Sequence, residues 1–586
     1  MVRRVFLIII LALLGVVLFI NPNFKTIAAG VAILLFGMIM LEDGFKAFTK
    51  GPLQKILKKA TNKLYKSIPI GAFVTALIQS SSLVSIITIS FLSAGLIDLF
   101  SALGIVFGAN IGTTATAWLV AGFGLKVKIS SLAMPMLIFG IIFSFQKKNS
   151  LKGIGNVLAG LGFFFLGIHF MKEGFEVFKG YIDLTEYAVS GFLGVVIYCA
   201  LGVVITTILQ SSSATLALIL TALAAGQIEY ENALALAIGA NIGTTITAIL
   251  GSLSSNVAGK RLAAAHFIFN TITGIVALFF IYPLAGLVDF LSDKVGIVEG
   301  DYVLKLALFH TIFNVVGVLL MLPFLKLLVR GLVLIFKEKE GGDIDEPKFL
   351  NDSVLKFPTS TISALLKESK YLFENAIFEI VTHALNVHRE DIKSDLKIKN
   401  VLKKSKKDFE IDVNDLYYKK VKTIYGKIIK YATKAQSSLS LSEVQNRHVS
   451  EIKIANRLMV EIIREIEDLR KNMSNYLYSD NKYIRNEYNK FRKKLVKVLR
   501  VLYLFRTQED KELFYSKLLK LKKESSRAIH HSNNSINKLI KDDLVSSKMA
   551  SSLINDNDNV NKAIGKMITI AELLYGEIDT LLENKE

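Results

Sequence analysis

Long stretches of this 586-residue chain contain almost no charged side chains, and no other property of the sequence limits its fold as strongly. Residues 1–340 contain 25 Lys and Arg and 15 Asp and Glu, so about 12% of the positions are charged. Residues 341–586 contain 45 Lys and Arg and 35 Asp and Glu, so about 33% are charged. A soluble domain carries about 25% charged residues. The first part is therefore predicted to be a membrane domain with a soluble domain after it. This excludes a soluble enzyme, a fibrous protein and a disordered chain.

Apolar runs recur through the first part, and a full crossing of the bilayer needs about 20 residues. The run Val5–Ile20 follows Arg3 and Arg4 and shows no small-residue cleavage site, so we expect an uncleaved first helix. The remaining runs cover residues 27–48, 69–97, 101–123, 129–145, 154–177, 191–225, 231–255, 262–285 and 303–336.

Lysine and arginine gather in a few short loops, and such loops are typical of the cytoplasmic side. The net charge of +20 is divided equally between the two parts, which favours flanks of membrane helices over a nucleic-acid surface. The predicted cytoplasmic segments are the N-terminus, residues 50–66, 146–153 and 260–261, and everything after Lys337. The acidic connections 180–190 and 286–302 are predicted to lie outside. These assignments agree only if residues 69–97 and 191–225 form re-entrant hairpins.

Two motifs occur twice in the membrane part, 131 residues apart. Gln79–Ser82 (Gln-Ser-Ser-Ser) recurs as Gln210–Ser213, and Gly108–Thr114 (Gly-Ala-Asn-Ile-Gly-Thr-Thr) recurs as Gly239–Thr245. The repeats span about residues 27–150 and 155–285, and their corresponding loops, 50–66 and 180–190, have opposite charge character. Two copies in opposite orientations form an inverted repeat, which many secondary transporters share. The sequence contains no P-loop, which argues against an ATP-driven pump.

The Gln-Ser-Ser-Ser motif is a poor fit to an unbroken membrane helix, because lipid supplies no partners for its polar groups. A break at this point would expose helix N–H groups that attract an anion and carbonyl groups that hold a cation. The glycines of the second motif predict a further unwound segment, with Asn and Thr oxygens as ligands. Small hydroxyl residues also allow close helix packing, but two motifs duplicated at the same spacing favour a functional site.

Neither motif-bearing segment contains a fixed cation. No Lys or Arg occurs between Lys66 and Lys126 or between Lys179 and Lys260. A divalent anion held by neutral donors alone would be costly in a pocket of low dielectric. Co-bound sodium would offset that charge, since hard cations take oxygen ligands. The residues thus predict coupled transport of a cation and an oxyanion, without identifying the oxyanion.

The duplicated motifs resemble the paired signature of the type II sodium–phosphate cotransporter family, over about residues 25–335. The resemblance implies sodium-coupled movement of inorganic phosphate, with sodium as the co-transported ion and no organic cofactor. It implies that phosphate and sodium are bound by Gln79, Ser80, Ser81, Ser82, Gln210, Ser211, Ser212 and Ser213. It implies that sodium coordination is completed by Asn110, Thr113, Thr114, Asn241, Thr244 and Thr245.

A smaller repeat, His-x-x-Phe-Asn, places His266 and Asn270 four residues apart, and likewise His310 and Asn314. Each pair falls on one face of a helix. A role toward substrate or protons is one interpretation. The favoured interpretation is hydrogen bonding between helices.

The soluble part, residues 351–586, follows a charged linker at 341–350. Its apolar residues recur at helical spacing and predict five or six long helices in bundles. It resembles the PhoU-like domains fused to bacterial members of the same family, which implies a cytoplasmic regulatory domain. Metal binding by acidic pairs, as in some of those proteins, is a second hypothesis beside a solvated helix face. The acidic pairs with that spacing are Asp391 with Asp395 and Asp408 with Asp412.

The sequence as a whole predicts an all-α, multi-pass symporter of the cell membrane, with an inverted repeat, re-entrant hairpins and cytoplasmic helical bundles. Its expected partners are inorganic phosphate, sodium and the lipid bilayer, but not nucleic acid. A homo-oligomer or a cytoplasmic partner of the tail stays open. The alternatives are a membrane phosphate sensor with the tail as its output, and a symporter of another small oxyanion.

Overall fold

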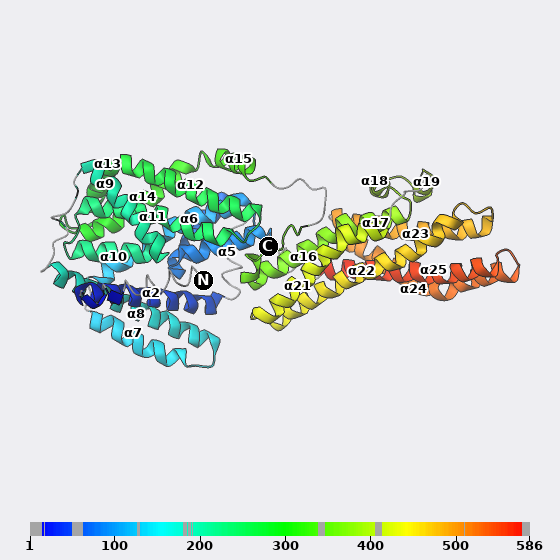
Figure 1. The fold of residues 1–586 in the computed structure, drawn as a ribbon, viewed down its shortest axis with the longest axis horizontal. Coiled ribbons are helices and arrows are strands. Elements are labelled where there is room, and N and C mark those ends of the chain that lie inside the picture. Colours follow the sequence, from blue (N-terminus) through cyan, green and yellow to red (C-terminus); the bar gives the residue numbers. More distant parts are fainter. Residues whose placement is uncertain are drawn as a thin grey trace. The chain divides into compact units, whose positions relative to one another are not determined.

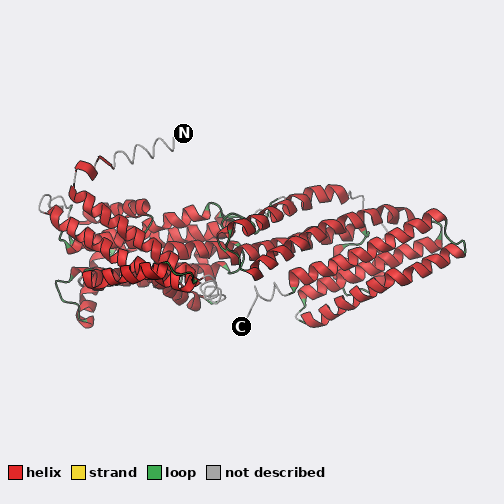
Figure 2. Ribbon diagram, turned by 90° about the horizontal axis from the view of Figure 1, so that it is seen from below, coloured by secondary structure: helices red, strands yellow, loops and turns green. Residues whose placement is uncertain are grey.

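The computed structural model describes residues 15–16, 18–20, 22–49, 63–125, 129–179, 185, 189, 191–337, 346–404, 413–508 and 510–576. Within these ranges every regular element is a helix, as Figure 2 shows by colour. The chain divides into two compact units, Met1–Glu338 and Lys339–Glu586, which we call the membrane unit and the C-terminal unit. The predicted all-α class is confirmed.

The membrane unit contains seven described helices that are long and apolar enough to cross a bilayer. They confirm a multi-pass membrane protein. The described helices of this unit are α2 (Pro22–Thr49), α4 (Leu64–Ile78), α5 (Ser81–Ser93), α6 (Leu99–Trp118), α7 (Ile129–Ser144), α8 (Asn149–Lys179), α9 (Gly191–Leu209), α10 (Ser212–Ala224), α11 (Tyr230–Ser252), α12 (Val257–Phe279), α13 (Ile281–Val295), α14 (Tyr302–Met321) and α15 (Leu325–Ile335), and a π-helical turn, Leu119–Gly124, extends α6.

Several helix bounds differ from the apolar runs of the sequence. The run 303–336 is divided between α14 and α15, because the chain leaves the helix after Met321. The connection predicted at 286–302 is shorter than expected, since α13 continues to Val295 and ends at Gly296, whose φ of 77° lies in the left-handed region. The segments 50–62 and 180–184, which carry most of the two loops used for orientation, lie outside the described residues.

Glycine repeats bring α2 and α8 into close contact, side by side in Figure 1. A Cβ atom on Gly37 would lie 2.7 Å from the carbonyl oxygen of Gly160, and one on Gly160 would lie 2.7 Å from that of Gly37. Gly30 and Gly167 form the same reciprocal contact. Gly30, the earlier residue on α2, meets Gly167, and the later Gly37 meets Gly160, which comes earlier on α8. The two helices therefore run antiparallel. Small residues that let backbones approach closely are typical of membrane helices.

The C-terminal unit is built from long amphipathic helices, six of which have 15 residues or more within the described ranges. Helix α22 packs against α25, and α25 also contacts α23 and α24. The described helices are α16 (Pro358–Leu372), α17 (Phe378–Ala384), α18 (Arg389–Lys393), α19 (Ile398–Lys404), α20 (Val413–Leu416), α21 (Thr423–Ser438), α22 (Glu443–Tyr476), α23 (Lys482–Thr507), α24 (Lys511–Lys541) and α25 (Ser547–Tyr575), with π-helical turns at Phe373–Ile377 and Tyr417–Lys422.

A buried carboxylate fixes the start of this unit. Glu368 on α16 accepts hydrogen bonds from the backbone N–H groups of Lys348, Phe349 and Leu350, at 3.2, 2.7 and 3.3 Å. Burial raises the pKa of Glu368, and the three N–H donors oppose that rise. Residues 348–350, which the sequence analysis placed in the linker, are therefore held against α16.

Candidate functional site

Each Gln-Ser-Ser-Ser motif interrupts a helix at its glutamine. Gln79 follows α4 with a φ of 60°, and Gln210 follows α9 with a φ of 53°; both lie in the left-handed region that ends helices. The next residue is extended in each copy and caps the following helix: Ser80 Oγ accepts from the N–H of Leu83, and Ser211 Oγ from that of Ala214, both at 3.2 Å. The break that the sequence predicted occurs in both copies.

The chain reverses direction at the second break. The hydroxyl of Thr206, on α9, donates to that of Thr215, on α10, at 2.9 Å. Two residues nine positions apart in a continuous helix would be separated by about 13 Å along its axis. This contact therefore shows that α10 folds back beside the end of α9. Helix α9 is itself long enough to cross a bilayer, whereas α4, α5 and α10 are shorter.

The breaks leave two helix N-termini without internal partners. The first N–H groups of α5 and α10, starting at Ser81 and Ser212, have no carbonyl group of their own helix to bind. Both serine side chains are buried, and within the described ranges neither hydroxyl bonds to another protein group. Such N-termini provide N–H donors and positive potential for an anion.

Thr116 on α6 joins the two motifs. Its hydroxyl donates to Oε1 of Gln79 at 2.8 Å and lies 3.1 Å from the hydroxyl of Ser213. The first motif and the second thus meet at a single side chain, which is 1% exposed. The matching contact on the other side joins Ser82 to Thr247 at 3.2 Å. The structure therefore brings Gln79 of the first copy and Ser213 of the second to one polar centre around Thr116.

The two glutamines are not equivalent. Gln79 is half-buried, and besides its bond to Thr116 it donates from Nε2 to the carbonyl oxygen of Ala76. Gln210 is exposed, and the structure shows no hydrogen bond from its side chain to Thr247. The bond between Thr116 and Gln79 therefore has no counterpart between Thr247 and Gln210.

The helices that carry the second motif are not unwound, which corrects the sequence prediction. Helices α6 and α11 run without interruption through Gly108–Thr114 and Gly239–Thr245. The glycines instead allow close packing, since a Cβ atom on Gly108 would collide with the carbonyl oxygen of Ile68 on α4. A Cβ on Gly239 would collide with that of Cys199 on α9 in the same way.

The asparagines of this motif hold the neighbouring helices together. Asn110 donates to Oδ1 of Asn270 at 2.5 Å, and its own Oδ1 lies 3.3 Å from Nε2 of His266. Asn241 makes the equivalent contacts on α14, to Oδ1 of Asn314 at 2.7 Å and to Nε2 of His310 at 3.2 Å. Hydrogen bonding between helices, the favoured interpretation of the His-x-x-Phe-Asn repeat, is confirmed.

The threonines of the motif donate within their own helices. The hydroxyls of Thr113 and Thr244 donate to the carbonyl groups four residues before them, both at 2.9 Å. Those of Thr114 and Thr245 donate to the carbonyl groups three residues before them, both at 2.7 Å. A hydroxyl that donates in this way keeps its oxygen lone pairs available as acceptors or cation ligands.

Thr116 and Thr247 were missed by the sequence analysis, although the sequence contained a signal. Both repeats continue as Thr-Thr-x-Thr-Ala, so Thr116 and Thr247 each lie two residues after the end of the second motif. Their contacts could not be read from that pattern, since they depend on which helices pack against α6 and α11.

The acidic pairs of the C-terminal unit show no metal site in the part of the chain that the structure describes. Asp391 forms an ion pair with Lys404 at 3.3 Å, and Asp395 is exposed. Asp408 and Asp412 lie outside the described residues. Among the described residues no three His, Cys, Asp or Glu side chains gather where they could hold a metal ion. Metal binding here stays a prediction.

Comparison with known proteins gives matches for the membrane unit. The pattern of the family described as Na+/Pi-cotransporter matches residues 33–173 and 190–287, and covers none of the C-terminal unit. The "Putative inorganic phosphate export protein YjbB" of Salmonella typhimurium is 31% identical over 343 residues, which are 58% of this chain and 61% of that protein. The chain thus spans less than two thirds of that relative.

Two further relatives extend this comparison. The uncharacterized protein YqeW of Bacillus subtilis is 30% identical over 320 residues, which are 53% of this chain and 97% of YqeW. The sodium-dependent phosphate transport protein 2C of Mus musculus is 35% identical over 117 residues, 19% of this chain and 18% of that protein. No solved structure matches the chain.

Proposed function

The chain belongs to the Na+/Pi-cotransporter family, and from this premise we propose that it carries inorganic phosphate together with sodium across the cytoplasmic membrane. The observation that carries the proposal is the meeting of the two Gln-Ser-Ser-Ser motifs at Thr116. Substrate sites of repeat-built transporters lie where broken helices of the two repeats meet. In the opposed inverted repeat that we propose, the helix N-termini at Ser81 and Ser212 would approach this centre from both repeats.

Phosphate suits the donors of this site. We propose that it is held by the first N–H groups of α5 and α10 and by the side chains of the two motifs. These side chains are Gln79, Ser80, Ser81, Ser82, Gln210, Ser211, Ser212 and Ser213. Hydroxyl, amide and backbone N–H groups are all donors to phosphate oxygens.

Sodium would offset the charge of phosphate in a site that lacks Lys and Arg. We propose that Asn110, Thr113 and Thr114, with Asn241, Thr244 and Thr245, complete its coordination. The four threonine oxygens retain lone pairs, as described above. Each asparagine oxygen accepts one hydrogen bond from a histidine at most, which leaves its second lone pair for a cation.

The C-terminal unit is proposed to be a cytoplasmic, PhoU-like regulatory domain, and the N-terminus to lie on the same side. The abundance of lysine in residues 50–66 and after Lys337 supports this orientation. A membrane phosphate sensor with this unit as its output is the competing function, and a symporter of another oxyanion is a third.

Transport of radiolabelled phosphate in proteoliposomes tests the proposal. Phosphate should cross with a sodium gradient and not with a potassium gradient, and loading the label inside tests outward movement, to which the name of the Salmonella relative points. Binding without transport would support the sensor, and transport of arsenate or sulfate in preference to phosphate would support the third function.

Serine substitutions test the site itself. Ser81→Ala and Ser212→Ala each remove one buried hydroxyl, and loss of a hydrogen bond to a charged ligand should weaken phosphate binding roughly 10- to 150-fold. Ser292→Ala is the control, since its hydroxyl is buried on α13. Sodium should tighten phosphate binding by the same factor by which phosphate tightens sodium binding. Unchanged affinity in both variants, or phosphate binding that ignores sodium, would contradict the mechanism.

A further inference from the structure

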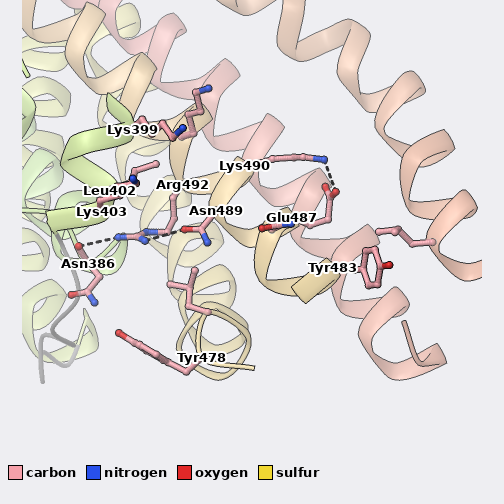
Figure 3. Close-up of a pocket in the computed structure, with 14 residues that line it drawn as sticks. Asn386, Lys399, Leu402, Lys403, Tyr478, Tyr483, Glu487, Asn489, Lys490 and Arg492 are labelled. Carbon is pink, nitrogen blue, oxygen red and sulfur yellow. Dashed lines mark hydrogen bonds and ion pairs between the residues drawn. The ribbon is translucent and has the colours of Figure 1, made fainter. Parts of the chain in front are cut away.

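The C-terminal unit contains a pocket of about 940 Å³, which has no part in the proposed transport site. Figure 3 shows its position beside α19 and α23. Asn386, which follows α17, the chain before α23, and Leu539 of α24 complete the lining. Its volume lies within the range of roughly 300–1,000 Å³ that is typical of small-molecule sites. It offers far more room than a single orthophosphate ion occupies.

The lining is strongly basic. Two lysines come from α19, Lys399 and Lys403, and three cations come from α23, Lys490, Arg492 and Lys493. Glu487 is the acidic residue of the lining, and it pairs with Lys490 at 2.6 Å. The lining thus holds five basic side chains and one acidic one, and its formal net charge is positive.

Lysines elsewhere in the same unit pair with carboxylates. Lys566 contacts Glu461 and Glu465 at 2.8 and 2.5 Å, and Lys522 contacts Glu572 at 2.8 Å. In contrast, Lys399, Lys403 and Lys493 have no carboxylate within ion-pair distance in the described part of the chain. Like charges that converge without partners repel one another, and a bound anion would remove that repulsion.

Arg492 provides a fixed and buried charge in the wall of the pocket, and it is 4% exposed. Its Nε donates to the carbonyl oxygen of Leu385 at 2.9 Å, and Nη2 donates to that of Asn386 at 3.2 Å. Nη1 contacts Oδ1 of Asn489 at 3.3 Å, as Figure 3 shows. A guanidinium held in this way is preorganised, and water screens it less than it screens the exposed lysines.

The cations are arranged in rows. Lys399 and Lys403 are four residues apart on α19, and Lys490 and Lys493 are three residues apart on α23. Residues at these spacings are neighbours on one helix face, about 5–6 Å apart at Cβ. Two such rows suit an extended anion with several phosphate groups better than one compact ion. Tyr478 and Tyr483 add aromatic rings to the same lining.

We propose that this pocket binds a small soluble polyphosphate, with three or more linked phosphate groups held by the lysines of α19 and α23 beside the fixed Arg492. The phosphate chain belongs either to a nucleoside triphosphate or to an inorganic oligophosphate. The two sources share the chemistry that the cations recognise. Only the nucleoside triphosphate carries a base, and a tyrosine ring of the lining provides a surface on which that base can stack.

Binding is measured by calorimetry on the purified full-length protein in detergent with EDTA present, using ATP, inorganic tripolyphosphate and orthophosphate as probes. Lys399→Gln/Lys403→Gln and, separately, Lys493→Gln should each weaken tripolyphosphate binding, the double variant by at least tenfold. The matched control is Lys520→Gln/Lys523→Gln, which removes two exposed lysines of α24 that do not line the pocket. Binding should also weaken with rising salt.

The outcomes separate the sources and the sites. If Tyr478→Ala loses ATP binding but still binds tripolyphosphate, the natural ligand is a nucleotide. If the wild type and Tyr478→Ala each bind ATP and tripolyphosphate equally well, the ligand is an inorganic phosphate chain. Ser81→Ala should not alter tripolyphosphate binding, whatever its effect on orthophosphate. Absence of tripolyphosphate and ATP binding at 1 mM, or an equal loss in the α24 control, would overturn the proposal. Circular dichroism confirms that each variant is folded.

Discussion

The hydroxyl of Ser82 lies 3.2 Å from that of Thr247, and the repeat relates this contact to a second one, between Ser213 and Thr116 at 3.1 Å. Both partners of the second contact lie 131 residues from those of the first, in exchanged order. Each Gln-Ser-Ser-Ser segment therefore contacts the helix of the other repeat that carries the second motif. If one repeat moves relative to the other, both contacts must either break or move with the repeats.

Valine at position 116 should impair phosphate binding more than valine at position 247. Thr116→Val removes the bond to Gln79 as well as the contact to Ser213, and both partners belong to the Gln-Ser-Ser-Ser motifs. Thr247→Val removes one contact to a motif, that with Ser82, and a bond within its own helix to the carbonyl oxygen of Thr244. Two neutral hydrogen bonds contribute about 1–2 kcal/mol, so we expect roughly 5- to 30-fold weaker binding for Thr116→Val. Titration of both variants with labelled phosphate provides the comparison. Equal effects would show that the bond to Gln79 has no role.

The two hairpins should differ in their response to loss of a threonine hydroxyl. Thr206 bonds to Thr215, but Val84 occupies the equivalent of position 215. The buried hydroxyl of Thr75 has no hydrogen-bond partner among the residues that the structure describes. Thr206→Val should destabilise the protein by about 1 kcal/mol, whereas Thr75→Val should leave stability unchanged or raise it. Val84→Thr should be tolerated, because it supplies the missing partner. Melting temperatures in one detergent test these expectations, and a larger loss for Thr75→Val would contradict them.

Stability of the C-terminal unit should fall as the pH rises through the range of Asp556. This carboxyl is 1% exposed and accepts from the hydroxyl of Tyr488 at 2.6 Å and from Asn472 at 3.0 Å. Burial raises its pKa to about 6 from 3.8, and the charge of Asp468 adds to the rise, against the lowering effect of the two hydrogen bonds. Between these two values the folded state binds the proton and the unfolded state does not.

The shift in the pKa of Asp556 has a defined sign and size. The protonated carboxyl contributes its full stabilisation of the folded state below about pH 4, and this contribution is lost as the pH rises to about 7. The free energy of unfolding changes by about 3 kcal/mol over this range, at 1.36 kcal/mol per pKa unit. Asp556→Asn should remove this component and flatten the profile. Thermal unfolding followed by circular dichroism from pH 4 to 7.5 measures the difference between the two proteins. Parallel profiles would show that the carboxyl does not titrate in this range.

Cysteine labelling should separate the two sides of the membrane. With Cys199 replaced by alanine, a cysteine at Val189 should react with an impermeant thiol reagent from outside, and one at Lys66 should not. The reason is that Lys66 belongs to the lysine-rich loop, which is expected to stay in the cytoplasm. Reaction of both positions from the same side of intact cells would contradict the inverted repeat. Permeabilised cells, in which both should react, provide the control.

Sequence alone was sufficient for the class of the protein and for the breaks at Gln79 and Gln210. Both depend on local chemistry: apolar runs of membrane length indicate membrane helices, and a run of polar side chains with no lipid partners indicates a break. The hydrogen bonds of His266 and His310 followed from the same reasoning, since a polar side chain on an apolar helix must find a partner on another helix.

The tertiary structure alone decided how the motifs are used. The glycines of Gly108–Thr114 predicted unwinding, but α4 lies so close to α6 that they serve contact between backbones instead. Thr116 became the meeting point of both repeats, and the pocket around Arg492 took shape, through contacts between side chains distant in the sequence. Local sequence sets where a helix begins, ends and breaks. Which of its faces meets which neighbour depends on the packing of all helices together, and no single segment encodes that arrangement.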